Sequence, residues 1–497
     1  MNKPLVIIAF LIIHCFFAYS CISQNIYCGP EESTLDRQGK YTILGELHNK
    51  LYFIQSLYGK NYLNSIDKDI LSLNDPYELG KTSQSTLFDY PILLEGHVLI
   101  FNLRNEDSKA MLYQNIYNME GKFLYDELLI EIEPLTLLLE EDKWNYKRLD
   151  YQFNESENGE SLVIGYLMRD KKSKELHHGL ITIEKNKPKS VEYSFIYSVL
   201  INENHNSRKF FDVIITNEKR VISSFGSSYV NFTHPDTKSN LPYECKIVGW
   251  KKNEGFFDFS MTNFGINYCD DISLSNKGSN IIMAAAILEK REKKSRIRLG
   301  GLVLGNVDFQ KKSIELLDSR KFGAEINNDP PKKDQGNAFE IELVDKGEYG
   351  GDILIRKIRN EDRVSWAMQL ISTPFDRDFN LKDTELIPIH QMAGYKEVNA
   401  LGSIILVKDS ITMVIHNNHQ ENLNATNMDG IAFSYNILGM NMRTQISKIT
   451  SRKITRALLF AEQETYSVIP SLTFISNEEL IINLRDVKKS KFCRLKF

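Results

Sequence analysis

The sequence lacks the short motifs that mark the best-known types of active site. The G-x-S-x-G nucleophile elbow, the H-E-x-x-H zinc motif, the phosphate-binding loop and the dinucleotide fingerprint are all missing. No Trp-Asp dipeptide follows any of the 3 tryptophans, and no sialidase-type Asp box occurs. The sequence therefore predicts no catalytic residue, no metal site and no cofactor.

Cysteine is scarce, and its spacing excludes two common kinds of site. The chain has 6 cysteines and no C-x-x-C pair, so a zinc ribbon or a thioredoxin-like redox site is not supported. Beyond the first 25 residues, four cysteines remain: Cys28, Cys245, Cys269 and Cys493. Four cysteines allow three disulfide pairings, and the sequence alone does not choose among them.

The chain also lacks a linker and an excess of basic charge. Its formal net charge is -4, so the chain lacks the excess of basic residues that is typical of nucleic-acid-binding proteins. With 42% hydrophobic and 25% charged residues, the composition is that of a globular protein. No Gly/Ser-rich or Pro-rich stretch divides it, and the segment 327–336 is expected to be a long surface loop. We therefore expect residues 24–497 to form a single domain.

The first 23 residues have the order of a secretory signal. Lys3 is followed by an apolar run over 5–17 and then by small residues. This run has about 13 residues, fewer than the roughly 20 that a membrane-spanning helix needs. Cleavage after residue 20 would leave Cys21 for lipidation, and cleavage after Ser23 would release the protein. Both alternatives stay open, and the expected location is periplasmic, outer-membrane-anchored or secreted, with membrane contact only through a lipid anchor.

The remaining chain repeats short apolar runs separated by polar turns. The runs begin near residues 51, 98, 162, 213, 281, 353, 411 and 480, about 61 residues apart on average. Many are continuously apolar, which indicates strands buried on both faces. Radial stacking of small antiparallel sheets buries strands in this way, so the pattern predicts an all-β chain folded as a single β-propeller of about seven blades, with eight as the alternative. The Ala-rich segment 279–292 has local helix propensity, but a partner run at 299–304 favours a hairpin.

A propeller must join its first and last blades, because an open sheet edge invites aggregation. Both 41–47 and 491–497 have strand-like sequences, and we expect them to lie in the same sheet. Cys28 and Cys493 would then come within disulfide reach, which would leave Cys245 for Cys269.

Three stretches resemble a family of uncharacterised exported proteins of Gram-negative bacteria that are predicted to be propeller-like. They are 121–132, 413–418 and the C-terminal blocks 477–482 and 491–497. Leu124 departs from the family pattern, which has a proline there. The resemblance implies export and a propeller fold, and it carries no activity.

The most polar candidate for ligand binding is the segment 416–422. It contains His416, Asn417, Asn418 and His419, whose amide and imidazole groups could hydrogen-bond a sugar. The two histidines could also ligate a metal if the segment folds back on itself. The alternative is a solvated hairpin loop, since Asn tolerates turn conformations.

Three further groups have structural explanations that we favour. His177-His178 and Asp270-Asp271 are neighbours on expected strands, so the two side chains of each pair point to opposite faces. The charged run 289–296 mixes both signs and suits a solvated turn.

The expected function is that of a non-enzymatic binding or scaffolding protein at the cell envelope, with a glycan or another envelope protein as partner. One alternative is a polysaccharide hydrolase with carboxylates at the mouth of the propeller channel. Another is a purely structural component of an envelope complex. An apolar patch on the rim would favour a scaffold.

Overall fold

The computed structural model describes residues 26–496 with the exception of short gaps. These gaps are 34–39, 58–59, 81–85, 95, 107–108, 133–138, 142–146, 150, 170–174, 186, 201–206, 230–244, 265, 267–268, 278–279, 291–296, 324–325, 327–336, 362–363, 395–401, 425–441, 451–453, 461–465, 477–478 and 486–488. The predicted signal, Cys21 and the predicted surface loop 327–336 lie outside the described residues.

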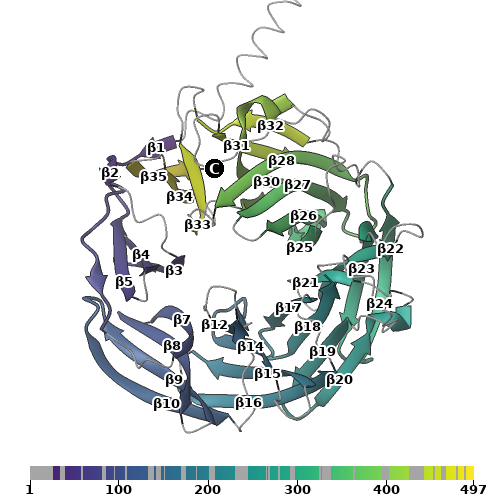
Figure 1. Cartoon of the computed structure of the whole chain (residues 1–497), viewed down its shortest axis with the longest axis horizontal. Helices are drawn as coiled ribbons and strands as arrows, with labels where there is room; N and C mark the ends of the chain where they lie inside the picture. Colours follow the sequence, from purple (N-terminus) through teal and green to yellow (C-terminus); the bar gives the residue numbers. More distant parts are fainter. Residues whose placement is uncertain are drawn as a thin grey trace, which may run out of the picture.

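The described residues form a ring of eight antiparallel sheets, which we call blades 1 to 8 (Figure 1). Seven sheets have four strands and one has five, and a separate hairpin lies between blades 2 and 3. No α-helix occurs in this part of the chain, and no helix there is long and apolar enough to cross a membrane. The fold is the predicted all-β propeller, with the alternative count of eight blades.

Each blade is built from strands that follow one another in the chain. Blade 1 contains β3 (Lys40–Leu47), β4 (Lys50–Leu57), β5 (Lys60–Asp67) and β6 (Tyr77–Glu78), and blade 2 contains β7 (Thr86–Leu94), β8 (His97–Glu106), β9 (Lys109–Asn118) and β10 (Phe123–Ile132). Blade 3 contains β13 (Tyr151–Glu155), β14 (Ser161–Arg169), β15 (Glu175–Glu184) and β16 (Lys187–Leu200), and blade 4 contains β17 (Ser207–Ile215), β18 (Val221–Tyr229), β19 (Lys246–Lys251) and β20 (Gly255–Ser260). The separate hairpin is β11 (Leu139–Glu141) with β12 (Lys147–Leu149).

The second half of the ring repeats this order. Blade 5 contains β21 (Cys269–Lys277), β22 (Asn280–Lys290), β23 (Ile297–Asp308) and β24 (Ser313–Lys321), and blade 6 contains β25 (Asn337–Asp345), β26 (Gly351–Glu361), β27 (Val364–Phe375) and β28 (Glu385–Gly394). Blade 7 contains β29 (Ser403–Lys408), β30 (Ile411–His419), β31 (Met442–Ile449) and β32 (Ile454–Leu458). Blade 8 contains β33 (Ser467–Ile475), β34 (Glu479–Arg485) and β35 (Lys489–Lys496), joined by β1 (Ile26–Cys28) and β2 (Glu32–Ser33).

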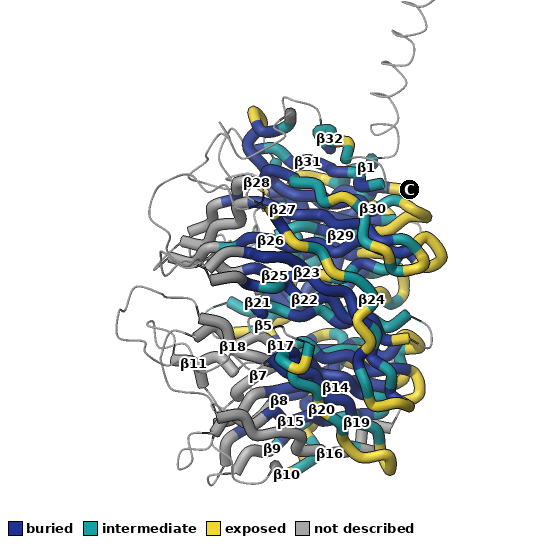
Figure 2. Tube along the Cα trace, turned by 90° about the vertical axis from the view of Figure 1, so that its right-hand side faces the viewer, coloured by how far each residue is buried: buried dark blue, intermediate teal, exposed yellow. Residues whose placement is uncertain are grey.

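The eight apolar runs of the sequence fall one in each blade. Seven of them are second strands (β4, β8, β14, β22, β26, β30 and β34), and the run near 213 lies in the first strand β17. A second strand is flanked by strands of its own sheet and covered on both faces by neighbouring blades, so it needs apolar side chains on both faces. Buried residues therefore run along these strands around the ring (Figure 2).

The hydrophobic core is divided among the interfaces between blades. For example, one cluster joins Phe101 of blade 2 to Tyr166 of blade 3, and another joins Phe53 of blade 1 to Phe474 of blade 8. The Ala-rich segment lies in β22, where Ala284, Ala285 and Ala286 are fully buried between blades. Packing there outweighs local helix propensity, and the predicted hairpin is confirmed.

The two ends of the described chain meet in blade 8, although the N-terminal strand is not the predicted one. The predicted pairing of 41–47 with 491–497 is wrong, because β3 starts blade 1 and pairs with β4. Instead β1 pairs with β35, and Cys28 lies opposite Cys493. The three-residue strand β1 completes blade 8, since β3 already forms the inner strand of blade 1.

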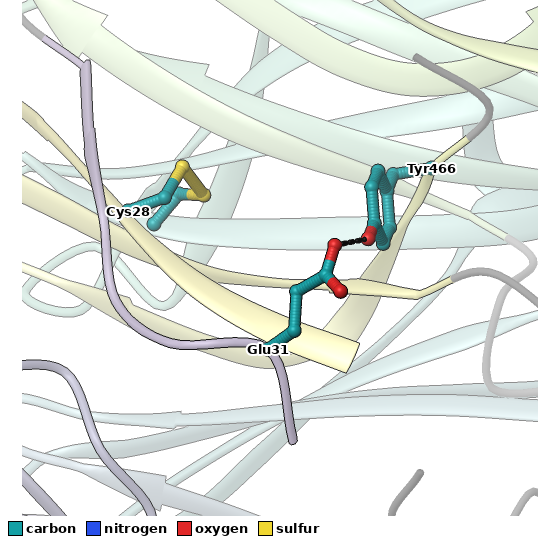
Figure 3. The surroundings of a disulfide bond; sticks show 4 residues. Cys28, Glu31 and Tyr466 are labelled. Atoms are coloured by element: carbon teal, nitrogen blue, oxygen red, sulfur yellow. Dashed lines mark hydrogen bonds between the residues drawn. A yellow bond between two sulfur atoms is a disulfide. The ribbon is translucent and has the colours of Figure 1, made fainter. Parts of the chain in front are cut away.

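A disulfide and an ion pair fasten this closure. Cys28 and Cys493 form a disulfide with a Cα–Cα distance of 4.1 Å. Nearby, the Tyr466 hydroxyl donates to the Glu31 carboxylate over 2.6 Å (Figure 3), and Lys489 pairs with the same carboxylate. These contacts lower the pKa of Glu31, with the Lys489 hydrogen bond as the largest cause.

The other two cysteines are not joined, which corrects the second predicted pair. Cys245 and Cys269 are buried thiols, and Cys245 Sγ donates a weak hydrogen bond to the Cys269 carbonyl over 3.6 Å. Both side chains belong to the apolar cluster between blades 4 and 5, where they pack as small hydrophobic groups.

Candidate functional site

The segment predicted to be an exposed polar loop is buried strand. His416, Asn417, Asn418 and His419 are the last four residues of β30, and none is more than 6% exposed. The prediction of an open loop is therefore wrong: the turn begins only at the 3₁₀ segment Gln420–Asn424. A role of these residues in ligand binding stays a prediction.

The two asparagines connect three consecutive blades. Asn417 Nδ2 donates to the Val468 carbonyl and Asn417 Oδ1 accepts from the Val468 N–H, both over 2.8 Å, which ties blade 7 to blade 8. Asn418 Nδ2 donates to the Pro388 carbonyl of blade 6 over 2.9 Å. Gln391 of blade 6 donates to the Asn417 carbonyl over 2.9 Å. Buried amide side chains whose hydrogen bonds are satisfied in this way hold neighbouring blades together.

His416 faces blade 6 and lies in a different environment. Its side chain is fully buried, and neither ring nitrogen has a hydrogen-bond partner. Burial lowers its pKa to about 4, assisted by the charges of Arg456 and Arg356 and opposed by the Val414 backbone. The ring is therefore neutral at pH 7. Among the described residues, no group of three or more His, Cys, Asp or Glu side chains is placed to hold a metal ion.

A serine–histidine pair between blades 3 and 4 has the geometry of a nucleophile and base but no access for a substrate. His178 Nε2 lies 2.6 Å from Ser223 Oγ, and His178 Nδ1 lies 3.1 Å from the Tyr166 carbonyl. Both side chains are buried, and burial lowers the pKa of His178 to about 4. Since no reacting group can reach Ser223, the pair serves packing between blades. The side chain of His177 lies outside the described residues.

Aspartates of the inner strands hold the next blade in register. Asp271 Oδ2 accepts the Ile341 N–H over 3.0 Å, and Asp212 Oδ2 accepts the Leu274 N–H over 2.9 Å. In each case the acceptor and donor lie one blade apart. Asp271, one of the two adjacent aspartates noted in the sequence, is thus engaged in the fold, and the side chain of Asp270 lies outside the described residues.

Two glutamates of the inner strand β25 form a charged group with one arginine. Glu340 and Glu342 lie on the same face of the strand, and Arg356 donates to Glu340 over 3.5 Å. Although Glu342 keeps exposed surface, partial removal from water raises its pKa, and the charge of Glu340 adds to this rise while Arg356 opposes it. β25 is the edge strand of blade 6 that lies nearest the centre of the ring in Figure 1, so this group belongs to the side of the blade that borders the central channel. The alternation of apolar and acidic residues over 339–343 is the sequence signal for this group.

Large exposed hydrophobic side chains are concentrated in β10, the outermost strand of blade 2, with one more in the neighbouring strand β6 of blade 1. The set consists of Tyr77, Phe123, Leu124, Tyr125 and Leu128, which are 38–55% exposed, and we call it the rim patch. These five make up nearly half of the large exposed hydrophobic side chains in the described chain. The two strands lie close together here, because a Cβ built on Gly121, two residues before Phe123, would lie 2.9 Å from the Tyr77 Cβ.

Sequence analysis missed the rim patch for a physical reason. Four of its members lie in β10, whose apolar residues resemble those of a buried strand. Only the assembled sheet shows that β10 is the outermost strand of its blade.

No protein-family model matches the sequence, and no curated protein matches it. Several solved structures are similar in fold. The Dos1 propeller is 7% identical, with 94% of this chain and 95% of that chain covered and a TM-score of 0.41. Apo prolyl oligopeptidase B from Galerina marginata is 9% identical (94% and 56% covered, TM-score 0.37). The α-L-arabinofuranosidase Arb93A from Fusarium graminearum is 8% identical (84% and 94% covered, TM-score 0.33).

The chain spans about half the length of the prolyl peptidases that it matches. At these identities the similarities concern the propeller fold, and they carry no inference about activity or ligand.

Proposed function

We propose that the protein is an exported, non-enzymatic scaffold of the cell envelope that docks a partner protein on the rim of blade 2. The rim patch is the observation that carries this proposal. A concentration of large exposed apolar side chains on one strand is uncommon on soluble proteins and is typical of interaction sites. A scaffold needs such a surface for its partner, whereas the hydrolase alternative would depend on carboxylates at the channel mouth instead.

The patch suits a partner that adds a strand to β10. In the described part of the chain the sheet of blade 2 ends at β10, so the outer backbone edge of this strand faces away from β9. Such an edge offers N–H and C=O groups to an extended peptide, while exposed side chains on both faces provide apolar contacts. Asp126, Glu127 and Glu131 interrupt the apolar residues. Two antiparallel copies of β10 would bring acidic residues together, so an apolar segment carrying Lys or Arg fits better.

Export is supported by the disulfide that closes the ring. Structural disulfides persist in oxidising compartments such as the periplasm and are rare in the cytosol. The bond between Cys28 and Cys493 agrees with the secretory signal expected at 1–23. Whether Cys21 is lipidated is a separate question, and labelling with palmitate in the native protein and in Cys21→Ala would answer it.

Site-specific photo-crosslinking in the native host tests the docking proposal. A photoreactive residue at Leu124 should give a discrete adduct with one protein, and Val407 provides a matched control because both side chains are 42% exposed. Leu124→Asp should abolish an adduct formed from position 128, whereas Val407→Asp should leave it unchanged. Equal adducts from 124 and 407, or none from 124, would refute docking at the rim patch.

A second candidate function is a polysaccharide hydrolase, favoured by Glu340 and Glu342 on the channel wall. Paired carboxylates can divide acid and base roles in glycoside hydrolysis. If purified protein releases reducing ends from a polysaccharide, and Glu340→Gln and Glu342→Gln each abolish this release while Leu124→Asp does not, the hydrolase replaces the scaffold.

A further inference from the structure

The first described residues form a short segment that bridges the last blade and the first. We call residues 26–33 the clasp. Its strands β1 and β2 pair with three and two residues of β35, so the clasp is the outermost layer of blade 8. Glu32 Oε1 accepts the Leu73 N–H over 2.7 Å and the Ser72 hydroxyl over 3.1 Å, which connects the clasp to blade 1. The clasp therefore crosses the seam at which the ring closes.

The ring itself is closed by a separate apolar interface. The cluster between blades 8 and 1, which joins Phe474 to Phe53, includes none of the described residues of the clasp. Ile26 and Cys28 are only partly buried, and they pack on a different cluster, between blades 7 and 8. The strands β33, β34 and β35 pair with one another independently of the clasp. Loss of the clasp would therefore leave the eight-bladed ring closed.

Apart from the disulfide, the contacts of the clasp are few and mostly exposed. The Gly29 N–H donates to the Phe492 carbonyl over 2.9 Å, and Glu31 binds Tyr466 and Lys489. The side chains of the Glu31–Lys489 pair are 44% and 58% exposed, and such pairs add little stability because water and salt screen them. Ordering the segment costs conformational entropy, which these contacts offset only in part. The disulfide is thus the main restraint on the clasp.

One sulfur of the disulfide can be approached from solvent. Cys493 is fully buried, whereas Cys28 is partly exposed in the outermost strand of the blade (Figure 3). Its neighbour Tyr27 is 52% exposed. Thiol–disulfide exchange needs a thiolate to reach one of the two sulfurs, so access decides which sulfur is attacked. The exposure of β1 makes Cys28 Sγ the point of attack.

We propose that the Cys28–Cys493 disulfide is a redox-controlled fastener that a dithiol reductant opens, which releases the clasp from blade 8. A thiolate of the reductant attacks Cys28 Sγ, the Cys28–Cys493 bond breaks, and Cys493 leaves as a thiolate that takes up a proton. The second thiol of the reductant then attacks the reductant sulfur in the mixed disulfide and frees Cys28 as a thiol. The reductant is oxidised to a disulfide, and the protein gains two electrons and two protons.

Release of the clasp changes the surface of blade 8. The strands β1 and β2 are the ones that cover the outer backbone edge of β35, so their departure uncovers this edge. An uncovered edge can accept an extended segment by strand addition. The reduced protein therefore has a sheet edge that the oxidised protein lacks. The rim patch lies on other blades, and either proposal can fail without the other.

Hydrogen exchange, measured by mass spectrometry on the purified protein, tests the release. Dithiothreitol under native conditions should accelerate exchange of the 26–33 peptide at least about thirtyfold, the factor that corresponds to the lower end of typical disulfide stabilisation. Peptides from β35 should also exchange faster, and peptides from β14 in blade 3 should not change.

Two variants assign the effect to the disulfide. Cys28→Ser should show the fast exchange of the clasp without reductant. Glu31→Gln is the matched control within the clasp, because it weakens an exposed ion pair and leaves the disulfide in place. It should change exchange of the 26–33 peptide less than about threefold.

Thiol labelling tests access to the disulfide and the extent of the change. After brief reduction with dithiothreitol, a maleimide should label Cys28 and Cys493, and peptide mass spectrometry identifies the labelled residues. Cys245 and Cys269 are buried thiols between blades 4 and 5 and serve as the internal control, because only wider unfolding exposes them. They should remain unlabelled under the same conditions.

Three results would overturn the proposal. The first is a disulfide that dithiothreitol reduces only after urea has unfolded the protein. The second is reduction that leaves exchange of the 26–33 peptide unchanged, which would show that the other contacts hold the clasp. The third is labelling of Cys245 and Cys269 together with Cys28, which would make the disulfide a staple of the whole fold.

Discussion

Replacing His416 by leucine should stabilise the protein, although the residue is fully buried at the interface of blades 6 and 7. In the native protein the ring is fully buried, and neither nitrogen has a partner at hydrogen-bond geometry, although the Val414 backbone lies close enough to oppose the lowering of its pKa. A buried donor or acceptor without a partner costs about 1–3 kcal/mol. A hydrophobic exchange of similar volume costs less than about 1.5 kcal/mol. Subtracting the second figure from the first, we expect His416→Leu to raise the free energy of unfolding at pH 7 by about 0–2 kcal/mol.

The advantage of the variant should grow as the pH falls. The pKa of His416 is lowered from 6.5 to about 4 by burial, so the unfolded chain takes up a proton before the folded chain does. The stability that the neutral ring provides is therefore complete above pH 6.5 and is lost as the pH falls toward 4. At 1.36 kcal/mol per pKa unit, wild type should lose about 2 kcal/mol at pH 5 that His416→Leu does not lose.

Urea unfolding at pH 7 and pH 5 measures both effects. His178→Leu is the matched control, since its ring has the same lowered pKa but contacts Ser223 and the Tyr166 carbonyl. This control should lose stability at pH 7 and show the same reduced dependence on pH. A large loss of stability in His416→Leu at pH 7, or a difference from wild type that does not change with pH, would show that the ring of His416 has partners.

Three further substitutions test other contacts. Lys346 and Asp352 form a buried ion pair at 2.7 Å. Lys346→Met leaves the Asp352 carboxylate without its counter-ion and should lower the free energy of unfolding by about 3–5 kcal/mol. Adding Asp352→Leu to the same chain should restore part of this loss, as measured by urea unfolding. Cys28→Ser removes the disulfide across a separation of 465 residues and should lower the free energy of unfolding by about 2–5 kcal/mol, the range typical of native disulfides, and reductant should then have no further effect on the melting temperature. Asp212 is part-buried, and burial raises its pKa from 3.8 to about 6, so its contribution to stability is present below pH 3.8 and lost as the pH rises through 6. The difference in unfolding free energy between wild type and Asp212→Asn should therefore change by up to about 3 kcal/mol between pH 3.5 and 7, less what contact with water screens, and a flat difference would contradict this reasoning.

The candidate site shows where sequence reasoning reaches its limit. The polar side chains of 416–419 were recognisable as unusual, but their burial was not. A strand end and a loop can have the same composition, and the groups that satisfy Asn417 and Asn418 lie 51 and 30 residues away. The opposite error occurred for the rim patch, where the sequence suggested burial and the structure shows exposure. The apolar residues of β10 resemble those of a buried strand, and only the order of strands in the sheet shows that β10 lies at its outer edge.

The sequence by itself determined the strand content and the repeat. Apolar β-branched runs and the turns between them are local signals, and each run marks one blade of the propeller. The expectation that the ring closes near both ends of the chain brought Cys28 and Cys493 within reach of each other, but the sequence did not choose their pairing, and the closing strand is β1 instead of the predicted 41–47. Only the tertiary structure decided the number of blades, the strand that closes blade 8 and the surroundings of every candidate side chain. The physical reason is that each blade is covered by neighbours about 60 residues distant, so burial, pKa and exposure are set by contacts that no local pattern records.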